Sequence, residues 1–275
     1  MKSVSAAVTL VSDLHCGSML GIVNCDEGVS LDEDDNGYRP SKGQRWLWQC
    51  WLDFIQRAKE NAKGRRHYLI LNGDLVDGQV KNSNQVITAD MTIQRQIALD
   101  VIDPLAQTAD RIFVIRGTEA HTGLSAREEE AIASDLESVE KSGKKISSWW
   151  ELRAEIGGVT FDVTHHVSGG GRAWTMGNTA NRVAAEAMFV AAQRDERAPD
   201  LVFRSHIHKY QDSGANFRAR AIILPAWQLR TAYAHRINAG IADVGGVLAQ
   251  TAQGRIENLT VKLYKPERRE TWRDE

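Results

Sequence analysis

The sequence has little cysteine, no long hydrophobic run and almost no net charge. Its three cysteines, Cys16, Cys25 and Cys50, are an odd number without C-x-x-C spacing, which excludes a disulfide framework and a structural zinc knuckle. We therefore expect a reducing compartment. The apolar stretch after Met1 has the length of one strand, too short for a secretion signal or a membrane span. The sequence accordingly predicts a cytoplasmic protein without a membrane partner.

The charge balance limits the range of partners. The chain has 34 basic and 36 acidic residues, a formal net charge of -2, so no global field attracts nucleic acid or an anionic membrane. Hydrophobic residues make up 42% and charged residues 25% of the chain, values near the globular average that exclude a disordered protein. A length of 275 residues favours one large or two small domains. We expect a single domain over residues 1–275.

Hydrophobic periodicity predicts alternating strands and helices in the first half of the chain. Apolar runs of strand length are separated by segments in which apolar residues recur at helical spacing. Ser125 and Glu128 have the spacing of a capping box at the start of the third helix. The predicted strands are Val4–Val11, Tyr68–Leu71 and Ile112–Ile115, and the predicted helices are Gln44–Ala62, Thr88–Ala109 and Ser125–Lys141.

The pattern changes after residue 148. Gly157 and Gly158 separate two strand-like runs, which is the signal of a β-hairpin, so we expect antiparallel pairing there. A helix and further strands follow. The predicted elements are the strands Trp149–Ile156, Val159–Thr164, Leu201–Phe203, Phe217–Leu224 and Ile256–Tyr264, and a helix from about Thr179 to Arg194.

Residues 17–43 interrupt this alternation. The segment is rich in glycine, acidic from Asp32 to Asp35, and contains Pro40, so we expect a surface insertion that regular structure does not fill. Two interpretations remain open, a solvated loop and a lid over whatever follows the first strand. For Trp46 and Trp48 in the next helix, packing against a sheet is favoured over base stacking.

Each of five predicted strands ends at side chains that can bind a metal ion. In an α/β sheet the carboxyl ends of strands share one edge, so residues distant in sequence meet in one crevice. Imidazole and carboxylate groups together suit Zn, Fe, Mn or Ni better than Ca or an all-oxygen Mg site. The clusters are Asp13 and His15, then Asp74, then Glu119 and His121, then His165, and finally His206 and His208.

Taken in order, these clusters resemble the motifs of the calcineurin-like metallophosphoesterases. Asp13-Leu14-His15 is similar to D-x-H, Gly73-Asp74-Leu75-Val76-Asp77 to G-D-x-x-D, and His206-Ile207-His208 to the end of G-H-x-H. The resemblance covers residues 13–208 and implies a four-layer α/β/β/α sandwich with two metal ions at the strand ends. It also implies the ligands: Asp13, His15 and His208 for the first ion, His165 and His206 for the second, and Asp74 for both.

The third motif departs from the family. In Gly117-Thr118-Glu119-Ala120-His121, Thr118 replaces an asparagine ligand and Glu119 replaces a catalytic histidine. We hypothesise that Glu119 takes over as the ligand and that His121 supplies the missing imidazole as general acid, with His166 as the second candidate. The alternative is that Thr118 binds weakly and the second metal site is partly degraded. Ser205, in place of the usual glycine before His206, should merely stiffen its turn.

The resemblance implies a hydrolase that cleaves phosphoesters by attack of a metal-activated hydroxide. We expect two divalent cations, manganese first, with iron, zinc or nickel as alternatives. A phosphodiester is slightly preferred over a phosphomonoester. A nucleotide or a nucleic acid is a candidate substrate. The short basic segment at residues 63–66 is the feature of the sequence, besides scattered arginines, that favours a nucleic acid. Arg116 and Arg172 are candidates for binding phosphate oxygens. The alternatives are a non-catalytic binding or scaffold module of the same fold and a hydrolase of another ester.

Overall fold

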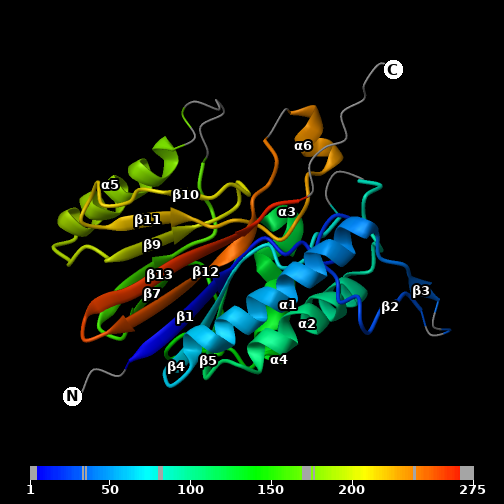
Figure 1. Cartoon of the computed structure of the whole chain (residues 1–275), viewed down its shortest axis with the longest axis horizontal. Helices are drawn as coiled ribbons and strands as arrows, with labels where there is room; N and C mark the ends of the chain where they lie inside the picture. Colours follow the sequence, from blue (N-terminus) through cyan, green and yellow to red (C-terminus); the bar gives the residue numbers. More distant parts are fainter. Residues whose placement is uncertain are drawn as a thin grey trace.

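The computed structural model describes residues 5–32, 34, 36–79, 83–168, 175, 177–237 and 240–266. Two sheets pack face to face, and helices cover their outer faces (Figure 1). This arrangement confirms the predicted four-layer α/β/β/α sandwich. No helix in the described part of the chain is both long enough and apolar enough to cross a bilayer.

The first sheet has six strands in the order β13-β12-β1-β4-β5-β6. Strands β1, β4, β5 and β6 are parallel, and β12 pairs antiparallel with both β1 and β13. Val11 is paired with Leu71 at the ends of β1 and β4, so the loops after these strands emerge together. The strands are β1 Ala6–Val11, β4 Arg66–Asn72, β5 Arg111–Ile115, β6 Ser148–Trp149, β12 Val244–Ala252 and β13 Arg255–Tyr264.

The second sheet has five strands in the order β10-β11-β9-β8-β7. β8, β9 and β11 are parallel, while β7 and β8 form the predicted hairpin with Ile156 paired to Val159. Gly157 and Gly158 both have positive φ, 62° and 81°, as a tight two-residue turn of this hand requires. The strands are β7 Leu152–Ile156, β8 Val159–Val163, β9 Leu201–Arg204, β10 Gln211–Asp212 and β11 Arg220–Ile223.

Helices complete the outer layers. The helices α1 (Lys42–Ala62), α2 (Met91–Ala106) and α4 (Arg127–Asp135) pack on the first sheet, and α5 (Asn178–Gln193) packs on the second. Ser41 begins α1 with a capping box to Gln44, which satisfies backbone N–H groups that would otherwise be unpaired. The short helices α3 (Glu119–Thr122) and α6 (Ala232–Arg236) lie near each other in the view of Figure 1.

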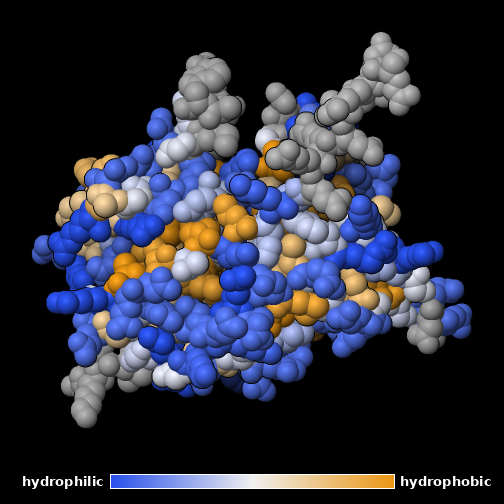
Figure 2. Space-filling model, in the orientation of Figure 1, coloured by the Kyte–Doolittle hydropathy of each residue, from blue (hydrophilic) through white to orange (hydrophobic). Residues whose placement is uncertain are grey.

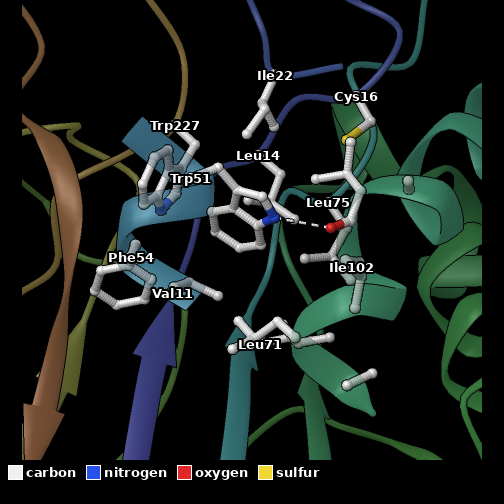
Figure 3. Packing of buried hydrophobic residues seen from close by; sticks show 14 of the residues in the cluster. Val11, Leu14, Cys16, Ile22, Trp51, Phe54, Leu71, Leu75, Ile102 and Trp227 are labelled. Atoms are coloured by element: carbon white, nitrogen blue, oxygen red, sulfur yellow. Dashed lines mark hydrogen bonds between the residues drawn. The ribbon is translucent and has the colours of Figure 1, made fainter. Parts of the chain in front are cut away.

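Separate apolar clusters hold the layers together. Between α1, α2 and the first sheet, Trp51 packs edge-on against Trp227 at 4.7 Å, and its indole N–H donates to Val101 O at 2.9 Å (Figure 3). Phe161 and Phe203 stack between the two sheets. These buried cores fix the strand ends from which the site is built.

Figure 2 shows a mostly hydrophilic surface, with hydrophobic residues gathered over the strands between α5 and α1.

Three elements differ from the sequence prediction: α4, β12 and the strand predicted over Trp149–Ile156. That strand is divided, because Trp149 belongs to β6 of the first sheet and Leu152 begins β7 of the second. The fourth helix, α4, begins at Arg127 rather than Ser125, because Ser125 and Ala126 both have positive φ. Glu128 forms ion pairs with arginines instead of a capping box. Strand β12 was not predicted, because Gly245 and Gly246 suggest a loop. At Gly246 a side chain would lie 2.5 Å from the Phe54 ring of α1, so a glycine is needed where this helix packs closely on the strand.

Only part of the segment predicted as a surface insertion lies at the surface. Ile22 and Val23 are fully buried. The rest contains a small hairpin of β2 (Val29–Ser30) and β3 (Gly37–Tyr38), and Asn24, Asp26 and Tyr38 bond to α2 or α1. The described residues of this segment are therefore anchored on the helical layer, which argues against a lid. Trp48, the partner of Asp26, is buried as the packing interpretation expects.

Candidate metal centre

The loops after β1, β4, β5, β8 and β9 meet at one edge of the sandwich. Backbone hydrogen bonds tie the first two together, from Asp13 N to Gly73 O and from His15 N to Asp74 O, both 3.0 Å. Several residues of these loops have positive φ, which is costly for residues with a side chain and is concentrated at functional sites. They are Asp13, His15, Asp74, His206 and His208, with φ of 53°, 47°, 51°, 75° and 53°.

Asp13, His15 and His208 form the first group of potential ligands. Asp13 Oδ1 lies 3.2 Å from His208 Nε2 and 3.9 Å from His15 Nε2. The two ring nitrogens are 3.1 Å apart. Ligands bound at about 2.1 Å to one transition metal are about 3 to 4 Å from each other. The three atoms are therefore spaced to share one cation.

Asp74, His165 and His206 form the second group. Asp74 Oδ2 lies 3.1 Å from His165 Nε2 and 4.0 Å from His206 Nδ1. The Thr118 hydroxyl donates to Asp74 Oδ2 at 3.1 Å and lies 3.1 Å from His206 Nδ1. Thr118 N–H also donates to Asp74 Oδ1, at 2.6 Å. Because His206 is 39% exposed while Asp74 and His165 are buried, this group opens to solvent on one side.

The two groups are connected through their carboxylates. Asp13 Oδ1 is 3.9 Å from His165 Nε2 in the second group. Asp74 belongs to a further group with His15 and His121, so it also faces the first. Asp74 thus stands between the two groups, where the family resemblance expects a shared ligand.

The donor atoms fit metal ions because some of them face only other potential ligands. Among the described residues, Asp13 Oδ1 and His165 Nε2 are buried without a well-formed hydrogen bond, and their nearest charged neighbours are His208 Nε2 and Asp74 Oδ2. His15 Nδ1 donates to Asp77 Oδ1 at 3.1 Å, so its Nε2 presents a lone pair to His208. Two cations at these positions would satisfy all of these atoms with the carboxylate and imidazole donors that transition metals prefer.

Electrostatic coupling within the cluster supports the same conclusion. Burial opposes the charged form of Asp13, but His208 and His165 outweigh it and lower its pKa to about 2. Burial also opposes charge on His165, yet Asp74 and Asp13 raise its pKa to about 10. The pKa of Asp74 falls well below its usual value, because His165 outweighs the effect of burial. The carboxylates therefore draw positive charge, a proton or a metal ion, into this edge.

Residues behind the cluster orient its histidines. Asn72 O accepts a hydrogen bond from His165 Nδ1 at 2.6 Å, and the Asn72 amide donates to Ser205 Oγ at 2.6 Å. Gln228 donates to Asp77 Oδ1 at 3.1 Å. Such partners fix the tautomer of a ligand histidine. Ser205 therefore does more than stiffen its turn: it links the loop after β9 to the end of β4.

The structure does not bring Glu119 to the cluster. Thr118 has the extended conformation of a helix N-cap and Glu119 is the first residue of α3. The Glu119 side chain is exposed, and it belongs to none of the potential ligand groups among the described residues. Thr118 instead contacts Asp74 and His206. Thr118, rather than Glu119, is therefore the residue of the third motif that lies against the second group, and the role of Glu119 as replacement ligand stays a prediction.

The two candidate catalytic histidines lie beside different groups. His121 is edge-on to His15, with ring centroids 4.6 Å apart, and its Nδ1 donates to Asp77 O at 2.7 Å. His166 lies 5.1 Å from His165 and 5.5 Å from His206 between ring centroids. Burial lowers the pKa of both imidazoles, aided by His15 next to His121 and by His165 next to His166. The structure thus places both residues beside the cluster.

Arg116 and Arg172 were predicted to bind phosphate oxygens, and the structure describes Arg116 alone. Arg116 donates to Ser148 Oγ at 2.8 Å and forms an ion pair with Glu130 at 3.3 Å. Its guanidinium also lies over the Trp150 ring at 5.1 Å. These contacts hold the side chain on the segment around β6, and its role in phosphate binding stays a prediction. Arg172 lies outside the described residues.

Sequence reasoning missed Glu129, a fully buried carboxyl group beneath the cluster. Its Oε2 accepts from Gly117 N at 2.5 Å, while no hydrogen bond to Oε1 is found among the described residues. Burial, together with the negative charge of Asp74, raises its pKa to about 8. Three consecutive glutamates at residues 128–130 are typical of a solvated helix start, so the sequence carries no signal for this burial.

Comparisons with known proteins place the chain only distantly. No protein-family model and no curated protein matches the sequence. Similar solved structures include a single mutant of Vps29 from Entamoeba histolytica (10% identity, TM-score 0.40, 94% of this chain and 99% of that one). Vps29 from Chaetomium thermophilum (9%, 0.40, 94% and 95%) and a dimetal phosphatase from Danio rerio (10%, 0.47, 94% and 95%) are also similar. At these levels the description of the fold rests on the sheets and layers themselves.

Proposed function

We propose that this protein is a phosphoesterase that works with two divalent transition-metal ions, manganese being the first choice. The observation that carries the proposal is the pair of ligand groups at one edge of the sandwich, which share Asp74 as a common neighbour. When bound, the two cations would polarise a phosphoryl group and make a water molecule acidic enough to attack it. The orphaned Asp13 Oδ1 and His165 Nε2 support the presence of such cations.

Charge at the cluster favours an anionic substrate. With Glu119 exposed, two carboxylates, Asp13 and Asp74, contribute negative charge to the ligand groups. Two dications with two carboxylates would leave a net charge of about +2, which attracts a phosphate ester but not a neutral amide or carboxylic ester. A diester remains slightly preferred over a monoester. Specificity for a nucleotide or nucleic acid has weaker support, because Arg116 is occupied by Glu130.

His166 is the residue that we assign as proton donor to the leaving group. It is exposed at the rim, next to His165 and His206, and belongs to none of the ligand groups among the described residues. A donor must meet both solvent and the departing oxygen. His166→Ala should therefore slow hydrolysis of esters with poor leaving groups far more than hydrolysis of nitrophenyl esters. Equal slowing of both would argue against this role.

Turnover of bis-p-nitrophenyl phosphate and p-nitrophenyl phosphate with Mn²⁺ tests the proposal. We expect metal-dependent hydrolysis that chelation abolishes and that His208→Ala lowers at least about 100-fold, in line with loss of a group that holds the metal. His235→Ala, which changes an exposed histidine of α6, is the matched control and should retain activity. Absence of hydrolysis of both esters by metal-loaded protein would contradict the proposal and favour a binding or scaffold module.

A further inference from the structure

His121 is the part of the cluster that the two ligand groups leave unexplained. It lies in α3, outside the motif positions that supply ligands, yet its donor atom is within 4.8 Å of those of His15 and Asp74. Its backbone packs closely against Gly78, where an added Cβ atom would lie only 2.6 Å from His121 O. Gly78 N in turn donates to the fully buried Gln94. The position of His121 is therefore built into the fold.

The tautomer of His121 follows from its hydrogen bond. A backbone carbonyl can only accept, so Nδ1, which contacts Asp77 O at 2.7 Å, must carry a proton. In the neutral ring Nε2 is then a lone pair with no proton to give. Nε2 is the ring nitrogen without this bond, so it is the one available to a cation. This arrangement suits a metal ligand, and it serves a general acid only when Nε2 also carries a proton.

Asp77 accepts a hydrogen bond from Nδ1 of both His121 and His15. Its carboxylate accepts from His15 Nδ1, and its carbonyl accepts from His121 Nδ1. His165 has the corresponding bond to Asn72 O. Metal-bound histidines characteristically donate their other ring N–H to a carboxylate or a backbone carbonyl. His121 therefore shares this bond with two histidines of the ligand groups.

We propose that His121 is an additional protein ligand of the cation bound beside His15, which rests on the proposed function for the presence of that cation. The donor atoms of His15, Asp74 and His121 all lie within 4.8 Å of one another, which is near enough for one cation to contact them. His121 would thereby give the first cation one more nitrogen ligand than the motif positions supply. The hypothesis that His121 is the general acid is replaced by this role, and the proton is left to His166.

Metal binding by the metal-free protein tests the inference directly. Titration with Mn²⁺ should show that His121→Ala weakens one of the two binding events at least about tenfold, while His166→Ala changes neither by more than about twofold. In Co²⁺-loaded protein, each bound histidine with a protonated Nδ1 gives an exchangeable, paramagnetically shifted proton signal. His121→Ala should remove one such signal, and His166→Ala should remove none.

Unfolding of the metal-free variants controls for misfolding. If His121→Ala fails to fold, His121→Gln, which retains a polar side chain of similar size, takes its place in both measurements. Wild-type affinity for both cations together with an unchanged set of shifted signals would overturn the inference. Such a result with normal wild-type hydrolysis leaves the proposed function standing, whereas metal binding without any phosphoester hydrolysis contradicts the proposed function alone.

Discussion

Replacing Thr118 by valine tests which residue of the third motif serves the second cation. The change keeps the size of the side chain and the N–H bond to Asp74 Oδ1, but removes the hydroxyl that contacts Asp74 Oδ2 and His206 Nδ1, each at 3.1 Å. Loss of a group that holds a metal ligand usually costs 10- to 100-fold in affinity, or about 1.4 to 2.7 kcal/mol. We expect a loss in this range for one cation, and almost none for the other.

Glu119→Ala is the matched comparison, because Glu119 is the next residue and is exposed. Each protein would be dialysed against limiting Mn²⁺ and its metal content measured by mass spectrometry. Wild type and Glu119→Ala should retain two equivalents, while Thr118→Val retains about one under conditions that just saturate the wild type. Loss of an equivalent from Glu119→Ala but not from Thr118→Val would refute the assignment of Thr118 and restore Glu119 as the ligand.

Further predictions concern the residues that support the cluster. The pKa of Glu129 rises from 4.5 to about 8 on folding, so the folded state binds more protons and metal-free protein should lose stability as pH rises through this window. Glu129→Gln should weaken this pH dependence of the melting temperature. Equal pH dependence of the melting temperature in wild type and Glu129→Gln would contradict the prediction. Gly117→Ala should lower stability by about 1–3 kcal/mol in denaturant titrations, since the added methyl would collide with Asp74; a neutral result would show that the loop can adjust. Arg116→Ala should cost about 1 kcal/mol of stability through its pair with Glu130 and leave KM unchanged, whereas a large rise in KM would return Arg116 to the substrate.

Local signals in the sequence were enough to locate the potential ligands. Asp13, Asp74 and His165 each follow a buried strand, and strand ends are readable from apolar runs because burial on both faces leaves little choice of residue. The hairpin at Gly157 and Gly158 was equally readable, since its turn requires positive φ at both positions. The alternation of strands and helices and the positions of most potential ligands therefore came from short-range patterns, whereas the four-layer sandwich was implied by the family resemblance.

Tertiary structure decided what the third motif and its surroundings do. Whether Thr118 or Glu119 faces the cluster depends on where α3 starts, and the burial of Glu129 depends on the packing of α4 under Gly117. The place of β12 beside β1 likewise depends on close packing at Gly246. The sequence by itself determined which chemical groups gather at the strand ends, because that follows from strand direction. Only the packed structure determined their roles, because a role depends on the burial of a side chain and on differences of a few ångströms in its distance to other groups. No local pattern in the sequence encodes either quantity.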